Sequence, residues 1–299
     1  MTYLNPSTKS LRFWGLLPSY LIMLCFLIIP IGIVLIVSFS TKGPYGGFEY
    51  TFSTESYQQL LFNKDWDDKL EFNPQYLIII GRTALLAFLS TVICLVIGFP
   101  VAYYIAQQRR KLRILLIYLV TLPFWVSMIV RVYAWMIILG NDGVIDKSVQ
   151  LLGFPSTGSL LFTNSATLIG MVYSYVPLMI LPLYASIEKL DSTLIEASHD
   201  LYGSRWVTLY RVILPLTQAG MISGAILVFV PCLGAFLEPV LLGGGKQLMM
   251  GNLIAMQFGS ARNWPFGSAI AIVLLVLVLI VLLMNALRVR HIKLETEHG

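Results

Sequence analysis

Long uninterrupted runs of apolar residues dominate the pattern of this chain. Six of them approach or exceed the roughly 20 residues that a helix needs to cross the hydrocarbon core of a bilayer. The predicted spans are 16–39, 83–106, 114–139, 166–187, 212–237 and 267–287. Because these runs are continuous and do not alternate with polar residues, they favour helices over a transmembrane barrel. We therefore predict an all-α polytopic membrane protein with six transmembrane helices, forming one domain over 16–287.

The composition supports this assignment. Among 299 residues, 57% are hydrophobic and only 12% are charged, against about 25% charged residues in an average soluble domain. So little charge argues against a disordered chain, a coiled coil and a nucleic-acid-binding protein. The first apolar run exceeds the usual 7–15 residues of a signal peptide, so we interpret it as an uncleaved span.

Basic residues predict the orientation of the spans. Twelve lysines and arginines lie in the two end segments, 1–15 and 288–299, and in the second and fourth connections, whereas six lie in the other connections. In membrane proteins, lysine and arginine are enriched in the connections on the cytoplasmic side. We therefore expect a multi-pass protein of the cell inner (cytoplasmic) membrane with both termini in the cytoplasm.

Residues that would support an enzyme are missing from the sequence. The segment Gly243–Lys246 resembles part of a phosphate-binding loop, but the pattern GxxxxGK[ST] would need glycine at Val240 and serine or threonine at Gln247. The three histidines and three cysteines have no metal-ligand spacing. We expect no catalytic residue, no metal site and no cofactor in this chain.

The connection between the fourth and fifth spans has a distinct pattern. Asp191 or Ser192 is positioned to cap a helix over about 191–203, and Gly203 to end it in a left-handed turn. A second short helix over 204–210 would follow, with Pro215 near the start of the fifth span. Exposed Leu, Tyr and Trp side chains on such a pair of helices are typical of a surface that meets a partner protein.

This connection resembles the EAA-x3-G-x9-I-x-LP motif of the permease subunits of binding-protein-dependent ABC importers. The chain matches the motif at Glu196, Ala197, Leu214 and Pro215, and departs from it at Ser198, Val212 and Tyr202, where glycine is expected. The resemblance implies a type I ABC importer (MetI-like) permease fold whose short helix docks into a cytoplasmic ATPase subunit. The residues assigned to this coupling are Glu196, Ala197, Ser198, Asp200, Leu201, Tyr202, Gly203, Leu214 and Pro215.

Further segments resemble spermidine/putrescine permeases. They include Pro123–Trp125, Arg131–Trp135, Asn141–Gly143, Pro182–Tyr184 and Asn263–Gly267. The resemblance implies a second homologous permease subunit, a cytoplasmic ATPase dimer that binds the ATP, and a periplasmic or lipid-anchored solute-binding protein. Permeases for ferric iron, thiamine and opines share much of this layout, so another solute stays open as an alternative.

Charged residues within or at the ends of spans indicate where a solute could pass, because such charges are costly in lipid. Arg131 lies in the third predicted span and Glu238 at the end of the fifth. A carboxylate and aromatic faces attract an ammonium group, and the predicted path is lined by Glu238, Phe236, Trp125, Tyr133, Trp135 and Arg131. Alternatively, Arg131 and Glu238 pair with each other or with the second subunit, and the aromatic residues form an interface belt.

Two more features of the last spans bear on function. Gly220 and Gly224 lie four residues apart in the fifth span and would let a neighbouring helix approach closely. The apolar segment Leu248–Phe258 is too short to span and predicts an interfacial or re-entrant helix.

A secondary transporter or channel is the alternative from another functional class. Such a protein would need several intramembrane carboxylates and no docking helix.

Overall fold

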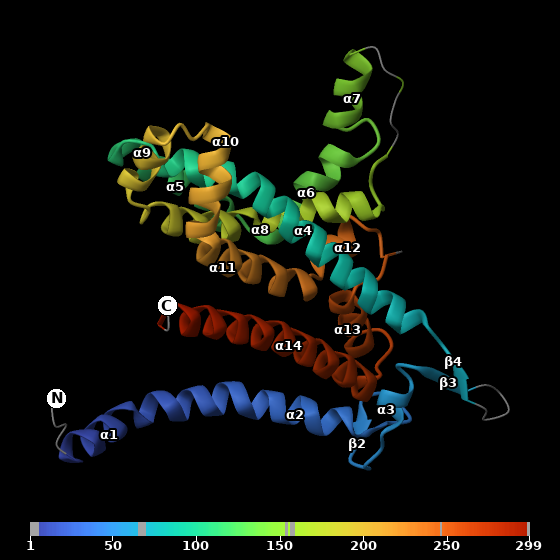
Figure 1. Ribbon diagram of the computed structural model, residues 1–299. Coiled ribbons are helices and arrows are strands. Elements are labelled where there is room, and N and C mark those ends of the chain that lie inside the picture. Colours follow the sequence, from blue (N-terminus) through green and yellow to red (C-terminus); the bar gives the residue numbers. More distant parts are fainter. Residues whose placement is uncertain (1–5, 65–69, 153–154, 156–158, 246, 298–299) are drawn as a thin grey trace. The chain divides into compact units, whose positions relative to one another are not determined.

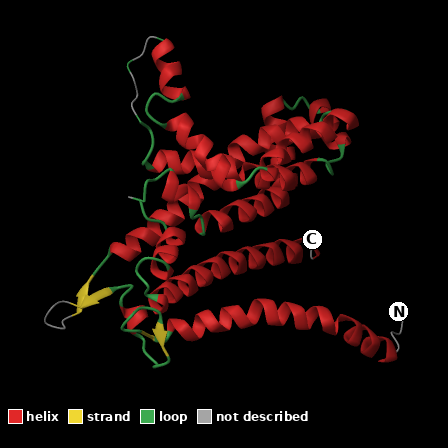
Figure 2. Ribbon diagram, turned by 180° about the vertical axis from the view of Figure 1, so that it is seen from behind, coloured by secondary structure: helices red, strands yellow, loops and turns green. Residues whose placement is uncertain are grey.

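The computed structural model describes residues 6–64, 70–152, 155, 159–245 and 247–297. These residues are mostly helical, with two small antiparallel hairpins (Figures 1 and 2). Within this described part of the chain, six helical segments are long and apolar enough to cross a membrane: Gly15–Ser38, Gln75–Ala106, Met128–Leu151, Asn164–Ile187, Arg205–Leu233 and Trp264–Leu287. The protein is therefore an all-α polytopic membrane protein, as the apolar runs predict.

The chain forms two compact units. One lies within Met1–Pro74 and Ile254–Leu277, and the other within Gln75–Leu253 and Val278–Gly299. The first unit holds the first apolar helix, built from α1 (Pro6–Met23), the π-helical turn η1 (Leu24–Ile28) and α2 (Ile29–Ser38). Most of its large side chains from Leu16 to Ile36 are exposed. A helix that is apolar and unburied on every side is suited to contact with lipid.

Both π-helical turns lie directly before a proline near the start of an α-helix. Pro30 follows η1, and Pro215 follows η2 (Leu209–Ile213) at the start of α11 (Leu214–Leu233). Proline has no N–H to donate to the carbonyl four residues earlier, which here belongs to Phe26 or Arg211. A wider π turn at this point keeps the proline ring away from that carbonyl, so that the helix continues. The helix Arg205–Leu233 is therefore continuous through Pro215.

The two hairpins have no counterpart among the predicted elements. β1 (Thr41–Lys42) pairs with β2 (Phe48–Glu49), and β3 (Phe62–Lys64) pairs with β4 (Leu70–Phe72), with α3 (Glu55–Gln58) between the two hairpins. Gly46 and Gly47 turn the first hairpin with φ values of 92° and 81°, a region that favours glycine. The N–H of Gly47 donates to the carbonyl of Arg262 at 3.0 Å. This hydrogen bond attaches the hairpin to the segment directly before α14 (Trp264–Glu297).

Three helices form the centre of the second unit: α4 (Gln75–Ala106), α8 (Asn164–Ile187) and α11. Met179 of α8 is fully buried where the three meet. A methyl group added to Gly224 would lie 2.7 Å from the Met179 sulfur, and one added to Gly98 would lie 3.1 Å from its Cγ. The close approach that the glycines of the fifth span predict is therefore present, with a further glycine contributed by α4.

The third predicted span, 114–139, is wrong as a single helix. It consists of α5 (Arg110–Trp125) and α6 (Met128–Leu139), with extended backbone at Val126 and Ser127. Pro123 removes one hydrogen bond from the last turn of α5, so that the helix ends two residues later. The apolar helix of spanning length in this region runs instead through α6 and α7 (Val144–Leu151).

Other boundaries also differ from the prediction. α4 begins at Gln75, eight residues before the expected position 83, and α11 ends at Leu233 before the short helix α12 (Leu237–Leu241). α14 continues to Glu297, through most of the segment 288–299 that we expected to be a tail. Helix α1 likewise begins at Pro6 within the expected tail 1–15, of which residues 1–5 lie outside the described part. The predicted helix over Leu248–Phe258 is present as α13 (Met250–Phe258).

Candidate functional site

The first candidate site is the connection between α8 and α11. Helix α9 (Ser192–Asp200) begins after Asp191, whose carboxylate accepts a hydrogen bond from the backbone N–H of Thr193 at 3.0 Å. This is one of the two caps that the sequence predicts. The hydrogen bonds from Thr193 favour the ionised carboxylate and lower the pKa of Asp191. A carboxylate at this position also interacts favourably with the positive end of the helix.

The turn after α9 differs from the prediction in one residue. We expected Gly203 to be left-handed, but Tyr202 is the left-handed residue, with a φ of 59°. Tyr202 occupies the position at which the EAA motif has glycine, the residue that adopts a left-handed backbone most readily. Gly203 is needed for another reason: a methyl group added there would lie 2.6 Å from the carbonyl oxygen of Ser198. The N–H of Gly203 donates to that same oxygen at 2.8 Å.

Side-chain hydrogen bonds join α9 to the next helix, α10 (Arg205–Thr208). The hydroxyl oxygens of Ser198 and Thr208 lie 2.9 Å apart, and a ring nitrogen of His199 lies 3.2 Å from the carbonyl oxygen of Gly203. Ser204 caps α10 by accepting from the backbone N–H of Val207 at 3.4 Å. These contacts hold α9, the turn and α10 as one unit.

Large apolar side chains are exposed on this helix–turn–helix unit. Tyr202 is 99% exposed, Leu201 83% and Trp206 70%. Glu196, Ala197 and Asp200 of α9 are also exposed. Leu214 and Pro215, the other predicted coupling residues, lie apart from this unit at the junction of η2 and α11.

A cavity of about 710 Å³ lies behind the unit. Its walls combine Phe99 and Tyr103 of α4 with Ile195 of α9 and Trp206 of α10. The cavity thus lies between the unit and α4, and Trp206 belongs both to its wall and to the exposed surface of the unit.

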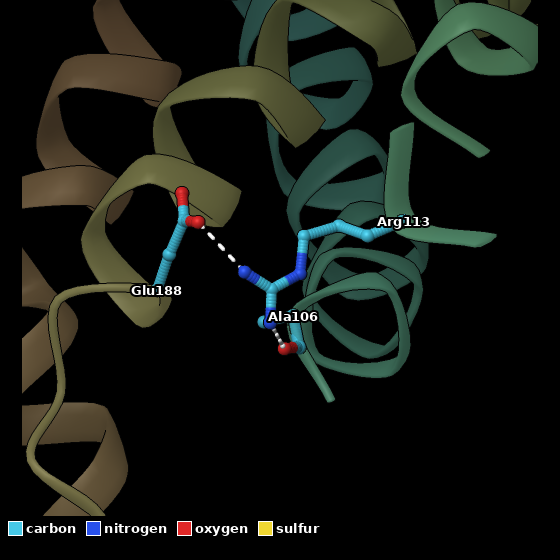
Figure 3. A network of polar contacts seen from close by, with 3 residues as sticks. All are labelled: Ala106, Arg113 and Glu188. Atoms are coloured by element: carbon cyan, nitrogen blue, oxygen red, sulfur yellow. Dashed lines mark hydrogen bonds and ion pairs between the residues drawn. The ribbon is translucent and has the colours of Figure 1, made fainter. Parts of the chain in front are cut away.

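An ion pair that the sequence analysis did not identify lies directly before this unit (Figure 3). Nη1 of Arg113 in α5 donates to Oε1 of Glu188, the residue after α8, at 2.7 Å. Nη2 of the same guanidinium donates to the carbonyl of Ala106, the last residue of α4, also at 2.7 Å. One side chain thus joins the ends of three helices. A guanidinium provides donors in a planar fork that can reach two acceptors at once.

Glu238 and Arg131 form the second candidate site. Glu238 of α12 is completely buried, and both of its carboxylate oxygens lack a hydrogen-bond partner among the described residues. The same is true of Nε and Nη1 of Arg131 in α6. Burial raises the pKa of Glu238, and Ser174 and Arg131 offset part of this increase.

The aromatic residues predicted to line a path with Glu238 lie in different surroundings. Trp125 is 86% exposed at the end of α5, Tyr133 on α6 is 52% exposed, and Phe236 is 42% exposed just before α12. Trp135 instead packs against a buried cluster formed by α6, α8 and α12, with its ring 5.5 Å from that of Tyr173. Whether any of them contacts a solute stays a prediction.

Comparison with known proteins gives the family of the chain. Residues 95–293 match the family model described as "Binding-protein-dependent transport system inner membrane component". The chain is 38% identical over 278 residues to the spermidine/putrescine transport system permease protein PotB of Haemophilus influenzae, covering 91% of this chain and 93% of that protein. The protein of the same name from Escherichia coli K12 is 36% identical, with 92% and 97% covered.

A solved structure shares the fold. A chain of a bacterial alginate ABC transporter, in complex with an alginate pentasaccharide-bound periplasmic protein, superimposes with a TM-score of 0.74. The alignment covers 96% of each chain at 17% sequence identity. This chain therefore has the same fold as that chain of the transporter.

Proposed function

Because the chain belongs to the family of binding-protein-dependent transport system inner membrane components, we propose that it works as one of two permease subunits of an ATP-driven importer. The chain spans the cytoplasmic membrane several times and forms a translocation path together with a second, homologous subunit. A separate cytoplasmic ATPase dimer binds and hydrolyses the ATP, and a periplasmic or lipid-anchored binding protein delivers the solute. In this proposal both termini are cytoplasmic, and the chain itself needs no cofactor.

The α9–α10 unit is the proposed contact with the ATPase. Its exposed Leu201, Tyr202 and Trp206 side chains are the observation that carries this assignment, because exposed aromatic and leucine side chains on a rigid helical unit are typical of a protein-binding surface. The contacts between Ser198 and Thr208 and between Gly203 and Ser198 keep the unit rigid. Movement of an ATPase subunit would therefore be passed to α8 and α11, from which the unit extends.

We propose a polyamine such as spermidine or putrescine as the solute. Two relatives with more than 35% identity over nine-tenths of the chain carry that name. The buried carboxylate of Glu238 is a suitable partner for an ammonium group, since a buried charge favours an opposite charge as its counter-ion. Trp125, Tyr133 and Phe236 would line the approach to it in the outward-open state, where their rings attract a cation.

The test is uptake of radiolabelled spermidine and putrescine into membrane vesicles that contain this chain with its partner subunits and binding protein. We expect ATP-dependent uptake, which a Glu196→Lys substitution on the exposed face of α9 abolishes. Glu49→Lys, a charge reversal at an exposed position of β2, is the matched control and keeps uptake. ATPase activity that depends on this chain without polyamine uptake would reject the solute, and uptake that ignores ATP would reject the importer.

A further inference from the structure

Glu238 and Arg131 carry opposite charges that are both left incompletely satisfied. Glu238 is completely buried, yet neither carboxylate oxygen has a hydrogen-bond partner among the described residues, and Nε and Nη1 of Arg131 are also buried without one. Removing a charge from water without pairing it costs several kcal/mol, on the order of the whole effect of a severe mutation. Such a pair of charges is therefore expected to have a use that offsets its cost.

The fold brings the two side chains into the same region. Val132, the neighbour of Arg131, belongs to the same buried hydrophobic cluster as Leu242, the residue that follows α12. Leu242 lies one helical turn after Glu238, and its N–H donates to the carbonyl of Glu238 at 2.9 Å. Residues four apart lie on the same face of a helix. Glu238 and Arg131 therefore lie in the same region of two helices that pack together.

Helix α8 provides the space for the carboxylate. Gly170 lies beside it, and a methyl group added there would lie 3.4 Å from Cγ of Glu238. Ser174 lies one turn further along the same face of α8 and is buried. Tyr175 of α8 and Cys232 of α11 also face the carboxylate. Among the described side chains that act on Glu238, Arg131 is the basic one.

Arg131 has a second favourable partner. Its guanidinium carbon lies 5.9 Å from the centre of the Phe124 ring, within the range of a cation–π interaction. Phe124 belongs to α5, on the other side of the extended residues Val126 and Ser127. The guanidinium therefore has an aromatic face on one helix and a carboxylate on another, and forms a hydrogen bond through Nε and Nη1 with neither.

We propose that Arg131 is a resident counter-ion of Glu238 that an incoming ammonium group displaces. The inference rests on the proposed transport of a cationic solute. In the empty protein the positive charge of Arg131 balances the negative charge of the Glu238 carboxylate. When an ammonium group reaches Glu238, the guanidinium moves toward the ring of Phe124, and the site then holds one excess positive charge. Repulsion from Arg131 returns the solute to the path, which prevents a buried carboxylate from holding a polyamine too tightly.

The charge relationship is tested by a double-mutant cycle on the complete purified complex. Apparent melting temperatures are measured for the wild type, Glu238→Gln, Arg131→Met and the double variant. We expect each single substitution to lower the melting temperature, since it leaves one buried charge without its counter-ion, and the double variant to be less destabilised than the two effects combined. Arg109→Met, which neutralises an exposed arginine, is the control. Additive effects would overturn the counter-ion relationship.

The displacement is tested by initial rates of spermidine uptake. For Arg131→Met we expect KM and the maximal rate both to fall by about five- to tenfold, because the competitor for the carboxylate and the repulsion that releases the solute are both lost. Arg131→Lys keeps the charge and should return both values toward those of the wild type. Unchanged kinetics in Arg131→Met, or equal kinetics in the two variants, would overturn the displacement.

The two proposals fail in different ways. A wild-type complex that takes up no polyamine would reject the proposed solute and, with it, the displacement. A wild-type complex that transports spermidine while the melting temperatures are additive would reject the role of Arg131 and leave the proposed function intact.

Discussion

The hydroxyl oxygens of Ser198 and Thr208 lie 2.9 Å apart and join the two short helices of the α9–α10 unit. The EAA motif has alanine at the position of Ser198. An alanine side chain has no hydroxyl group and could not form this hydrogen bond. Thr208 also donates to the carbonyl of Ser204 at 3.2 Å. Thr208 is therefore fixed by its own helix, and Ser198 attaches α9 to it.

Replacing Ser198 by alanine should loosen this attachment without unfolding either helix. A neutral intramolecular hydrogen bond contributes about 1 kcal/mol, and Thr208 would keep its bond to Ser204. We expect amide hydrogen exchange in α9 and the following turn to accelerate about fivefold, with a smaller loss of transport. Ser223→Ala in α11 is the control, because the Ser223 hydroxyl donates only to the carbonyl of Ala219 in its own helix. Equal exchange in wild type and Ser198→Ala would contradict the prediction.

Tyr202 has a left-handed backbone conformation with a φ of 59° and is almost completely exposed. For a residue with a Cβ this conformation costs roughly 1–2 kcal/mol. Because the Tyr202 side chain is exposed, packing within the chain does not offset that cost. We therefore predict that Tyr202→Gly slows amide exchange in the turn and yet weakens binding of the ATPase, because the aromatic side chain is lost. The stability of the turn should therefore rise while the affinity for the ATPase falls.

Tyr202→Asn separates these two contributions. Asparagine tolerates the left-handed conformation but has no aromatic ring. If the ring serves the contact, co-purification of the ATPase and uptake should fall in both Tyr202→Asn and Tyr202→Gly. Undiminished ATPase binding in both variants would show that the aromatic ring is not part of the contact surface.

Periodicity and capping predict much of this protein, because both are local properties of the sequence. The continuous apolar runs predict most of the spanning helices, and Asp191, one of the two predicted caps, begins α9. The break at Val126 and Ser127 was missed because an apolar run continues through it. Pro123, inside the run, was the available signal, but Pro100 and Pro177 also lie in runs and interrupt neither α4 nor α8.

Contacts between distant segments were the part that the sequence could not predict. Arg113 was counted only as one of several basic residues that indicate the cytoplasmic side, and nothing near it in the sequence names Glu188 as its partner. Glu238 and Arg131 were identified by their charge within apolar surroundings. Their burial and their shared region depend on the packing of α6 against α12, which no local pattern specifies.

The Arg113 side chain should stabilise the junction of α4, α5 and α8 by more than its ion pair alone. The pair with Glu188 is partly exposed, with side-chain exposures of 27% and 43%, and such pairs contribute less than about 1 kcal/mol. The hydrogen bond to the carbonyl of Ala106 adds a charge-assisted contact. We expect Arg113→Met to lower the melting temperature of the complex clearly more than Glu188→Gln does.

Two further variants make this comparison specific. Arg110→Met removes a neighbouring exposed charge of α5 and should leave the melting temperature nearly unchanged. In the double variant Arg113→Met/Glu188→Gln the result should equal that of Arg113→Met, since Glu188 then has no ion pair to lose. Equal effects of Arg113→Met and Glu188→Gln would mean that the bond to Ala106 contributes nothing.

Transport should depend on pH through Glu238. Burial raises the pKa of this carboxyl, so acidification protonates it at a pH where exposed carboxyl groups are still ionised. Among the described residues, the titratable and charged groups that face it are Arg131 of α6, Tyr175 of α8 and Cys232 of α11. Since an ammonium group needs the ionised carboxylate, uptake should fall on acidification with a midpoint above the ordinary glutamate value.

The measurement is the initial rate of spermidine uptake between about pH 5 and 8, divided at each pH by the ATPase rate of the same vesicles, so that effects on the ATPase cancel. Spermidine keeps its positive charge at the acidic end, where aliphatic amines are fully protonated, so a loss of uptake there reports on the protein. In Glu238→Gln the residual uptake should be lower at neutral pH and should lack the acidic decline, because no carboxyl remains to titrate. An acidic decline with the same midpoint in wild type and Glu238→Gln would assign the titration to another group and separate Glu238 from solute recognition.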